Sequence, residues 1–332
     1  MNRREFFRQT IGMSAAAAAL GAAQSGCSAQ PGGSDSPTPA PRAEVIHVHD
    51  PAVRIQGERF DAQRLGAMLD KALMRLANAN DAPAAWKALF SPKDVVGLKV
   101  NCLAGPRLST HPAVVDQIVR GLRLAGVPDG NIYIWEMKSP DLQRVGFQLT
   151  SSRTGLHCAG TDGHYDSDIS YSGKVGSCLA PFVSRLCTAH INVPIVKDHL
   201  VAGLGVGLKN FYGAIHNPNN YHDNMCDPYV ADVNAFPQIR NRLRLIVCDA
   251  LNAQYDGGPT LRPDRLWDEN SLLLSRDPVA LDAIAMQIID KRRVEAGLKT
   301  LADCGRAPRW LDTARRYGLG ENDPQRIEVG QL

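Results

Sequence analysis

The chain has 332 residues, and its 37 lysines and arginines nearly balance its 34 aspartates and glutamates, giving a formal net charge of +3 at pH 7. No block of basic residues interleaved with aromatics occurs along it, which disfavours a nucleic-acid partner. After residue 27 there is no apolar run of about 18 residues or more, so we expect no transmembrane segment in the mature chain.

Residues 1–27 resemble a twin-arginine export signal. Arg3 and Arg4 precede an uncharged, alanine-rich run from Ile11 to Ala23, and small residues follow it, which is the order of parts in a cleavable signal. The alternative, a membrane-spanning helix, is disfavoured because this run is too short to cross a hydrocarbon core of about 30 Å. The resemblance implies recognition by the twin-arginine translocation machinery and export to the periplasm or cell envelope. Cargo of this route folds first and often acquires a metal or redox cofactor.

A tether and a candidate lipid anchor follow the signal. Cys27 stands where an exported chain can be lipidated, although Gln24 replaces the leucine-like residue of the lipoprotein pattern. Residues 28–43 are mostly Gly, Ser, Pro and Ala, the composition of a flexible and partly extended linker. Either a lipid anchor at Cys27 or a simple spacer fits this arrangement. We expect the folded domain to occupy residues 44–332, which are enough to bury a substantial core.

Strand and helix patterns alternate through this domain. Residues 94–100 have the β-branched character of a strand, residues 112–124 place apolar side chains on one helical face after Thr110 as N-cap, and residues 131–135 indicate a second strand. Further elements are expected at residues 191–196 (strand), 201–214 (helix), 243–248 (strand) and 279–296 (helix), with a polar excursion or hairpin at 151–174. This order predicts an α/β fold with a mostly parallel or mixed sheet and helices on both faces, in one domain or two closely packed lobes.

Polar side chains follow three of the expected strands. In open α/β sheets ligands gather at the carboxyl ends of the strands, so these side chains are candidates for one site. The candidate ligand-binding residues are Lys99, Asn101, Lys197, Lys209 and Asn210, and the candidate catalytic residues are His111, His199 and Asp249. The lysines and asparagines suit a small anionic ligand, while histidine, with its near-neutral pKa, suits proton transfer.

The segment that carries Lys209 and Asn210 is rich in glycine. Its glycines, at 203, 205, 207 and 213, permit close helix packing, and the segment lacks the Gly-Lys-Ser/Thr order of a phosphate loop. A lysine in such an apolar setting needs an anionic partner, either a protein carboxylate or a ligand.

Three histidines are candidate metal ligands. His199, His216 and His222, with Cys226 close by in the sequence, offer imidazole and thiolate donors, which suit zinc and other transition metals. Their spacing matches no compact metal motif. Metal ligation, plain structural roles and acid–base work without a metal are therefore all open at this stage.

Seven cysteines follow Cys27, and no Cys-x-x-Cys spacing occurs among them. Ferredoxin-type clusters and zinc ribbons need closely spaced cysteines, so we expect no self-contained iron–sulfur module of that type. In an oxidising compartment Cys178 and Cys187 are the nearest candidates for a disulfide. Cys248, inside an apolar run, is expected in the core.

Four ordered segments resemble the domain of unknown function family 362 (DUF362). They are residues 96–101 with 109–112, residues 194–199, residues 207–213 and residues 275–282, so the resemblance covers roughly residues 90–290. It implies an α/β domain that is sometimes fused to iron–sulfur modules and has no general activity assigned. Because this chain lacks such modules, electron transfer would depend on a redox partner.

The last of these segments has two interpretations. Asp277 is a natural N-cap with Pro278 at the first helical position, and Asp282 lies in the early part of the same helix. Alternatively, the two carboxylates bind a metal or orient one of the lysines.

Two functional hypotheses result. In the first, the chain is an exported enzyme that binds an anionic substrate or cofactor and carries out redox or metal-assisted chemistry. In the second, it is a non-catalytic ligand-binding protein or an accessory protein of a membrane redox complex. Stoichiometric metal and turnover would favour the first, whereas a metal-free protein stabilised by small anions would favour the second.

Overall fold

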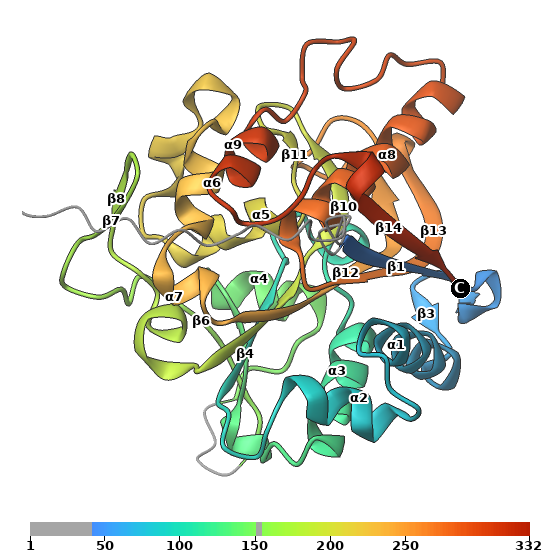
Figure 1. The fold of residues 1–332 in the computed structure, drawn as a ribbon, viewed down its shortest axis with the longest axis vertical. Coiled ribbons are helices and arrows are strands. Elements are labelled where there is room, and N and C mark those ends of the chain that lie inside the picture. The colour runs from blue at the N-terminus through green and yellow to red at the C-terminus, as the bar shows by residue number, and fades with distance from the viewer. Residues whose placement is uncertain (1–41, 151–154) are drawn as a thin grey trace, which may run out of the picture. The chain divides into compact units, whose positions relative to one another are not determined.

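The computed structural model describes residues 42–150 and 155–332. The expected export signal, Cys27 and nearly all of the tether lie outside these residues. Within them a ten-stranded sheet runs in the order β14-β1-β13-β12-β9-β4-β5-β6, with β10 attached to β12 and β11 to β10 (Figure 1). No described helix is long and apolar enough to cross a membrane.

The sheet has a parallel half and a mixed half. Its strands are β1 (Ala43–His49), β4 (Val96–Val100), β5 (Ile132–Glu136), β6 (His157–Gly160), β9 (Ala189–Val193), β10 (Ile195–His199), β11 (Gly203–Leu204), β12 (Leu243–Gln254), β13 (Leu266–Ser275) and β14 (Ile327–Gln331). Neighbours from β12 through β9, β4 and β5 to β6 are parallel, whereas β13 is antiparallel to both β12 and β1. Two hairpins lie outside this sheet, β2 (Arg54–Gln56) with β3 (Arg59–Phe60) and β7 (Ser170–Ser172) with β8 (Val175–Ser177).

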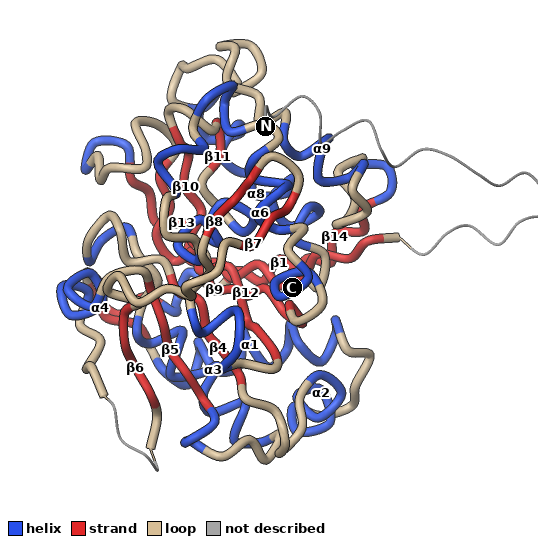
Figure 2. Tube along the Cα trace, turned by 90° about the vertical axis from the view of Figure 1, so that its left-hand side faces the viewer, coloured by secondary structure: helices blue, strands red, loops and turns tan. Residues whose placement is uncertain are grey.

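Helices cover both faces of the sheet (Figures 1 and 2). One face carries α1 (Ala62–Leu76), α2 (Ala82–Leu89) and α3 (Pro112–Leu124), and the other carries α5 (Gly207–Asn210), α6 (Tyr229–Asn234), α8 (Pro278–Glu295) and α9 (Trp310–Arg316). The short helices α4 (Ser139–Val145) and α7 (Pro237–Arg240) complete the set. A buried hydrophobic cluster lies on each side of the sheet. The predicted α/β fold, with a mixed sheet and helices on both faces, is confirmed.

The alternation of side chains along β4 directs a lysine toward the α5 side of the sheet. Val96, Leu98 and Val100 pack in the hydrophobic cluster that includes α1 to α3. Because successive side chains of a strand point to opposite faces, Gly97 and Lys99 face the other way. The space beside Gly97 is filled, since a Cβ there would lie 2.9 Å from both Sγ of Cys187 and Nδ1 of His190. Lys99 itself is buried inside the fold.

Two predicted helices form within one residue of their expected bounds, and one predicted cap is wrong. The α3 helix spans Pro112–Leu124, and α8 begins at Pro278 with the carboxylate of Asp277 accepting hydrogen bonds from the amides of Val279 and Ala280. The N-cap of α3 is His111 and not Thr110. The Thr110 hydroxyl is used elsewhere, because it donates to the Val193 carbonyl and accepts from the Asn101 amide.

The helix predicted at residues 201–214 does not form. The segment instead contains β11, the single turn of α5 and a 3₁₀ turn at residues 211–214. Gly203 has a φ of +77°, a left-handed conformation that ends any regular helix there. The run of apolar residues resembled a buried helix, but its glycines made a strand and two short turns possible.

The remaining sequence predictions are met in part. The predicted strand at 243–248 is longer, since β12 continues to Gln254. Within 151–174, of which 151–154 lie outside the described residues, β6 joins the sheet beside β5 and β7 begins a hairpin with β8. Cys248 is fully buried, as predicted. Cys178 and Cys187, the nearest candidates for a disulfide, are not paired with each other and are both free thiols.

Candidate functional site

Eight of the predicted site residues line one cavity of about 530 Å³ at the carboxyl ends of β4, β5 and β10. They are Lys99, Asn101, Lys197, His199, Lys209, Asn210, His216 and His222. This set comprises every predicted ligand-binding residue and every predicted metal ligand. Two other hollows, of about 510 and about 730 Å³, are lined by none of these residues. We therefore describe the first cavity as the lysine pocket.

Lys99 forms the buried floor of the lysine pocket. Its side chain is 1% exposed, and Nζ lies 3.3 Å from the Glu136 carboxylate and donates to the Val100 carbonyl (2.6 Å) and to Oδ1 of Asn210 (3.2 Å). A buried ammonium needs such partners, because burying an unpaired charge is costly. Gly213 makes room for this lysine, since a Cβ at that position would lie 2.8 Å from Cε of Lys99.

Asn210 ties this floor to the neighbouring strand. Its amide nitrogen donates to the Lys99 carbonyl (3.1 Å) and to Oδ1 of Asn192 (2.7 Å), and its oxygen also accepts from Nδ2 of Asn101 (3.1 Å). Both polar atoms of the Asn210 side chain are therefore already hydrogen-bonded to other residues of the protein. Asn210 acts mainly to hold the residues of the pocket in position.

Lys197 extends from β10 into the same cavity, and the side chain that accepts a hydrogen bond from its ammonium group is neutral. Its Nζ donates to Oδ1 of Asn101 at 2.9 Å, and no carboxylate of the described residues lies within 4.0 Å of it. Burial lowers the pKa of Lys197 to about 8; Lys99 also lowers it, and Glu136 opposes the shift. The protein thus holds an ammonium group here that its own side chains do not neutralise.

Lys209 presents a second such amine. Its Nζ lies 3.2 Å from Nε2 of His222 and 3.4 Å from the centre of the Tyr212 ring, a close cation–π geometry. Among the described residues no carboxylate lies within ion-pair distance of it. Burial is the largest cause that lowers its pKa, to about 7, and the charge of Lys197 adds to the effect.

Asp282 places Lys209 by holding the start of α5. Its two carboxylate oxygens accept the amides of Gly207 (2.7 Å) and Leu208 (3.0 Å), which α5 itself cannot satisfy because they belong to its first turn. Asp282 is fully buried, and burial raises its pKa to about 7. Of the two interpretations of this carboxylate, the structure supports a role in orienting a lysine-bearing turn.

The charges around the lysine pocket are unbalanced. Four lysines line it, and of the two lining carboxylates Glu136 pairs with Lys99 while Asp141 pairs with Arg144 at 2.9 Å. The ammonium groups of Lys197 and Lys209 therefore face the cavity without a carboxylate. Such a cavity is complementary to a negatively charged ligand.

The hydrogen bonds of two histidines assign their protons. Nδ1 of His199 accepts the amides of Val201 (3.2 Å) and Ala202 (3.1 Å), and Nδ1 of His216 accepts the amide of Cys178 (3.0 Å). In the neutral ring the proton then sits on Nε2. Burial and nearby cations lower the pKa of His199 to about 3, so this ring is neutral. A metal bound at Nε2 of either ring would have to displace that proton.

No described group of three or more histidine, cysteine, aspartate or glutamate side chains is arranged to hold a metal ion. The third candidate, His222, directs Nε2 at Lys209, and burial and that lysine lower its pKa. The arrangement fits proton transfer and ligand binding more directly than metal ligation. The metal prediction stays a prediction.

An unusual stretch of backbone borders the pocket beside His222. Asn224, Met225 and Cys226 have φ values of 51°, 57° and 64°, so three consecutive residues other than glycine adopt the left-handed conformation. Side-chain contacts hold them, since Nη2 of Arg309 donates to Oδ1 of Asn224 at 2.8 Å. Backbone of this kind is costly and persists where the surrounding structure enforces it.

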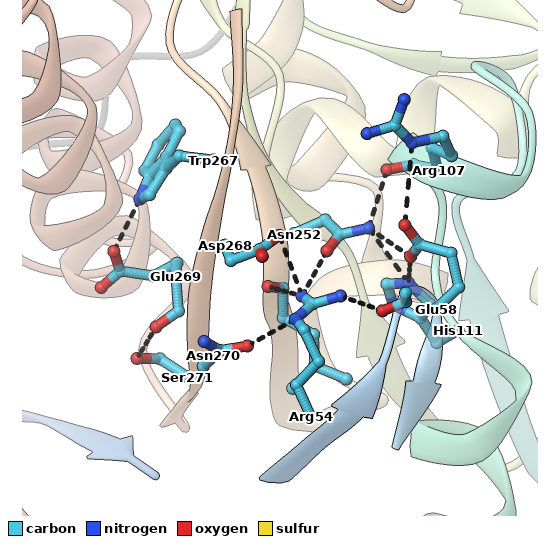
Figure 3. Close-up of polar contacts among 12 residues, drawn as sticks. Arg54, Glu58, Arg107, His111, Asn252, Trp267, Asp268, Glu269, Asn270 and Ser271 are labelled. Atoms are coloured by element: carbon cyan, nitrogen blue, oxygen red, sulfur yellow. Dashed lines mark hydrogen bonds and ion pairs between the residues drawn. The ribbon is translucent and has the colours of Figure 1, made fainter. Parts of the chain in front are cut away.

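His111 and Asp249 lie together but outside the pocket lining. Nδ1 of His111 is 2.8 Å from Oδ2 of Asp249, which also accepts the His111 amide. Nε2 of the same ring is 3.2 Å from Oε2 of Glu58 (Figure 3). Burial opposes charge on this ring, but the two carboxylates outweigh it and raise the pKa of His111 to about 9. Asn252 and Arg107 complete the outer side of this cluster.

The position of Asp249 follows from strand alternation. Val247 and Leu251, two residues to either side, belong to the hydrophobic cluster that includes α1 to α3, so Asp249 points to that face. Lys99 emerges on the opposite face, where it meets Asn210 and the Trp135 ring. Residues at the same edge of the sheet are therefore divided between its two faces.

Two residues that contact the lysines of the pocket were not predicted. Glu136 pairs with Lys99, and Tyr212 packs under Lys209. Glu136 is the last residue of β5, so the rule that located Lys99 also applies to it. The Tyr212 contact depends on tertiary packing and has no local signal.

Comparison with known proteins gives a family match and a distant structural match. A family model described as "Domain of unknown function (DUF362)" matches residues 96–287, and no curated protein matches. Among solved structures, the crystal structure of a Thermotoga maritima protein from a structural genomics consortium is similar, with 9% sequence identity and a TM-score of 0.38. That match covers 74% of this chain and 61% of the other, so the chain spans less than two thirds of the length of the Thermotoga protein.

Proposed function

This chain belongs to the DUF362 family of domains of unknown function, and we propose that its lysine pocket binds a small organic anion. The observation that carries the proposal is the pair of ammonium groups, on Lys197 and Lys209, that face one cavity without a carboxylate partner. A carboxylate or phosphate group would supply the missing charge and accept their hydrogen bonds.

Binding of an anion would reverse the effect of burial on these lysines. In the ligand-free pocket burial lowers the pKa of Lys197 to about 8 and that of Lys209 to about 7. An adjacent negative charge favours the protonated form and raises both pKa values. The protein should therefore take up protons as it binds the anion, and the size of the uptake reports how many lysines are engaged.

We propose further that the protein is an exported enzyme of redox or metal-assisted chemistry, since residues 1–27 resemble a twin-arginine signal. In this proposal the lysines hold an anionic substrate or cofactor, and His199, His216 and His222 transfer protons or hold a metal. Any electron transfer would need a redox partner. The alternative is a non-catalytic ligand-binding or accessory protein of a membrane redox complex.

Elemental analysis tests the metal part of the proposal. The protein would be purified with its signal intact from a host that loads cofactors, beside a His199→Ala/His216→Ala variant. Near-stoichiometric metal in the first sample and its loss in the second would support a histidine metal site. Equal metal content in both samples would refute that site and leave anion binding unaffected.

The anion proposal is tested by isothermal titration with a panel of small carboxylates and phosphates. We expect a ligand to bind the parent protein and to bind Lys197→Ala and Lys209→Ala at least tenfold more weakly. Lys87→Ala is the matched control, because Lys87 is exposed on α2, on the opposite face of the sheet. Equal affinity of the parent and both pocket variants would show that the lysine pocket is not the anion site.

A further inference from the structure

The lysines of the pocket differ in what their amines can do. Lys99 is fully buried, and its Nζ is engaged by Glu136, Val100 and Asn210. Lys197 also lines the cavity, but its Nζ donates to the amide oxygen of Asn101, which does not take up a proton. Lys209 is only half-buried and lines the cavity, and its Nζ has an imidazole as its hydrogen-bonding neighbour. Of these three lysines, Lys209 is the one whose amine is both open to the cavity and beside a proton acceptor.

We propose that Lys209 forms an imine with the carbonyl group of a small oxo acid held in the lysine pocket. This inference rests on the proposed anion pocket, to which it adds a substrate class and a covalent step. In it the acid group of the ligand binds at Lys197, and the carbonyl carbon faces Nζ of Lys209. A ligand with both groups would use both amines that lack carboxylate partners.

The surroundings of Lys209 favour a nucleophilic amine. An amine attacks a carbonyl only in its neutral form, and enzymes produce that form by burying a lysine or by placing it beside another cation. Both conditions hold here, because Lys209 is partly buried in the pocket wall and shares the cavity with Lys197.

Asp282 and the α5 turn fix where this amine lies. The Asp282 carboxylate binds the first two amides of α5, and Lys209 follows in that same turn. The ring of Tyr212, whose hydroxyl donates to the Tyr221 carbonyl at 2.8 Å, supports the end of the lysine side chain. A nucleophile supported at both ends loses little conformational freedom when it reacts.

The covalent step balances without an oxidant or a metal. Nε2 of His222, 3.2 Å away, accepts a proton from the Lys209 ammonium. The neutral nitrogen attacks the carbonyl carbon, a C–N bond forms, and the carbonyl oxygen becomes a hydroxyl as it takes up a proton from the attacking nitrogen. The C–O bond then breaks, and the hydroxyl leaves as water with the proton returned by His222. One water is released for each imine formed, and no group is oxidised or reduced.

The alternative nucleophiles are distinguishable. Lys138 also lines the cavity, but its side chain is exposed and is not held by a packed aromatic ring as Lys209 is, so it should react slowly. Lys197 is needed in its charged form to hold the acid group. The proposal therefore assigns the covalent adduct to one residue of the four.

The test is reductive trapping on the full chain. The protein is incubated with oxo acids from pyruvate to 2-oxoglutarate, treated with sodium borohydride, and analysed by intact mass and peptide mapping. The matched hydroxy acids, which have no carbonyl group, are run in parallel and also measured by thermal shift. Lys209→Arg keeps the charge but cannot form the imine, Lys209→Met serves if the arginine variant does not fold, and Lys138→Arg is the control within the same cavity.

We expect one reduced adduct per chain on Lys209, lost in Lys209→Arg and retained in Lys138→Arg. A thermal shift with both oxo and hydroxy acids but no adduct would overturn the imine and leave the anion pocket standing. An adduct that maps to Lys138 or is spread over surface lysines would overturn it as well. If no acid of either kind shifts the melting temperature and no adduct forms, the anion pocket fails together with the imine.

Discussion

Replacing Lys197 by methionine should stabilise the ligand-free protein and weaken anion binding at the same time. Lys197 is 2% exposed, and burial lowers its pKa from 10.5 to about 8. Each pKa unit corresponds to about 1.4 kcal/mol, so keeping this ammonium in the fold costs about 3 kcal/mol at pH values below 8. Relaxation and water reduce this figure, and Asn101 loses a donor worth about 1 kcal/mol. We expect a net gain of about 1–2 kcal/mol in the free energy of unfolding at pH 7.

The same variant should lose affinity for the anion. A hydrogen bond between charged groups contributes about 1.5–3 kcal/mol, which corresponds to a Kd roughly 10-fold to 100-fold higher. Urea titrations of the parent, Lys197→Met and Lys87→Met measure stability, and isothermal titration measures binding. The reasoning is refuted if Lys197→Met destabilises the ligand-free protein by more than about 1 kcal/mol or binds the anion as tightly as the parent does.

Three further predictions concern pH and positioning. Anion affinity should fall as pH rises through about 7 and about 8, the pKa values of Lys209 and Lys197, because the protonated amines bind the anion. Titration calorimetry in two buffers of different ionisation enthalpy would detect the proton uptake. A Kd that does not change with pH would contradict this prediction. The raised pKa of His111 contributes stability that is complete below the ordinary pKa of 6.5 and is lost as pH rises through about 9. Urea midpoints should therefore fall over that range in the parent protein but not in His111→Asn. This variant should itself be about 3 kcal/mol less stable, because the buried Asp249 carboxylate loses its cationic partner. Asp282→Ala should lower the free energy of unfolding by about 2 kcal/mol and weaken anion binding. Asp282→Asn keeps one acceptor for the α5 amides, so it should lose less stability and less affinity. If both variants show the same change in urea midpoint and in Kd, Asp282 has no positioning role.

The architecture could be predicted because its signals are local. Residues 94–100 and 131–135 carry the β-branched pattern of buried strands, and residues 112–124 place apolar side chains at helical spacing. Their order along the chain implies parallel strands with helices on both faces, and that is the fold observed. The strand-end rule then led to the lysine pocket, because carboxyl ends of parallel strands meet at one edge.

The same rule could not divide residues between the two faces of the sheet. Lys99 and Asp249 both lie toward the carboxyl ends of strands, yet Lys99 shares a face with Asn210 while Asp249 shares a face with Val247. Register relative to the core decides this, and it requires knowing which neighbours are buried on which side. His111 lies on the same face as Asp249, because its ring and its amide both bind that carboxylate.

The missed features depend on contacts between distant parts of the chain. The residues from 201 to 214 could not be recognised as a broken segment because the carboxylate that binds the start of α5 belongs to Asp282, more than 70 positions later. Similarly, the turn at Asn224 is held by Arg309 from the C-terminal region. Neither contact changes the local pattern of apolar and polar residues, so neither can be read from it.

Several costly features of this fold lie at the lysine pocket. Away from it, the buried Asp94 carboxylate is matched by Arg244 through two hydrogen bonds of 2.8 Å. At the pocket, Lys197 and Lys209 have no carboxylate, and the neighbouring turn at residues 224–226 holds three left-handed residues, each costing roughly 1 kcal/mol. A sequence selected for stability alone would place glycines in that turn and apolar residues at both lysines. Natural proteins depart from such local rules mainly where function requires it, so the departures point to the same cavity as the unbalanced charge does.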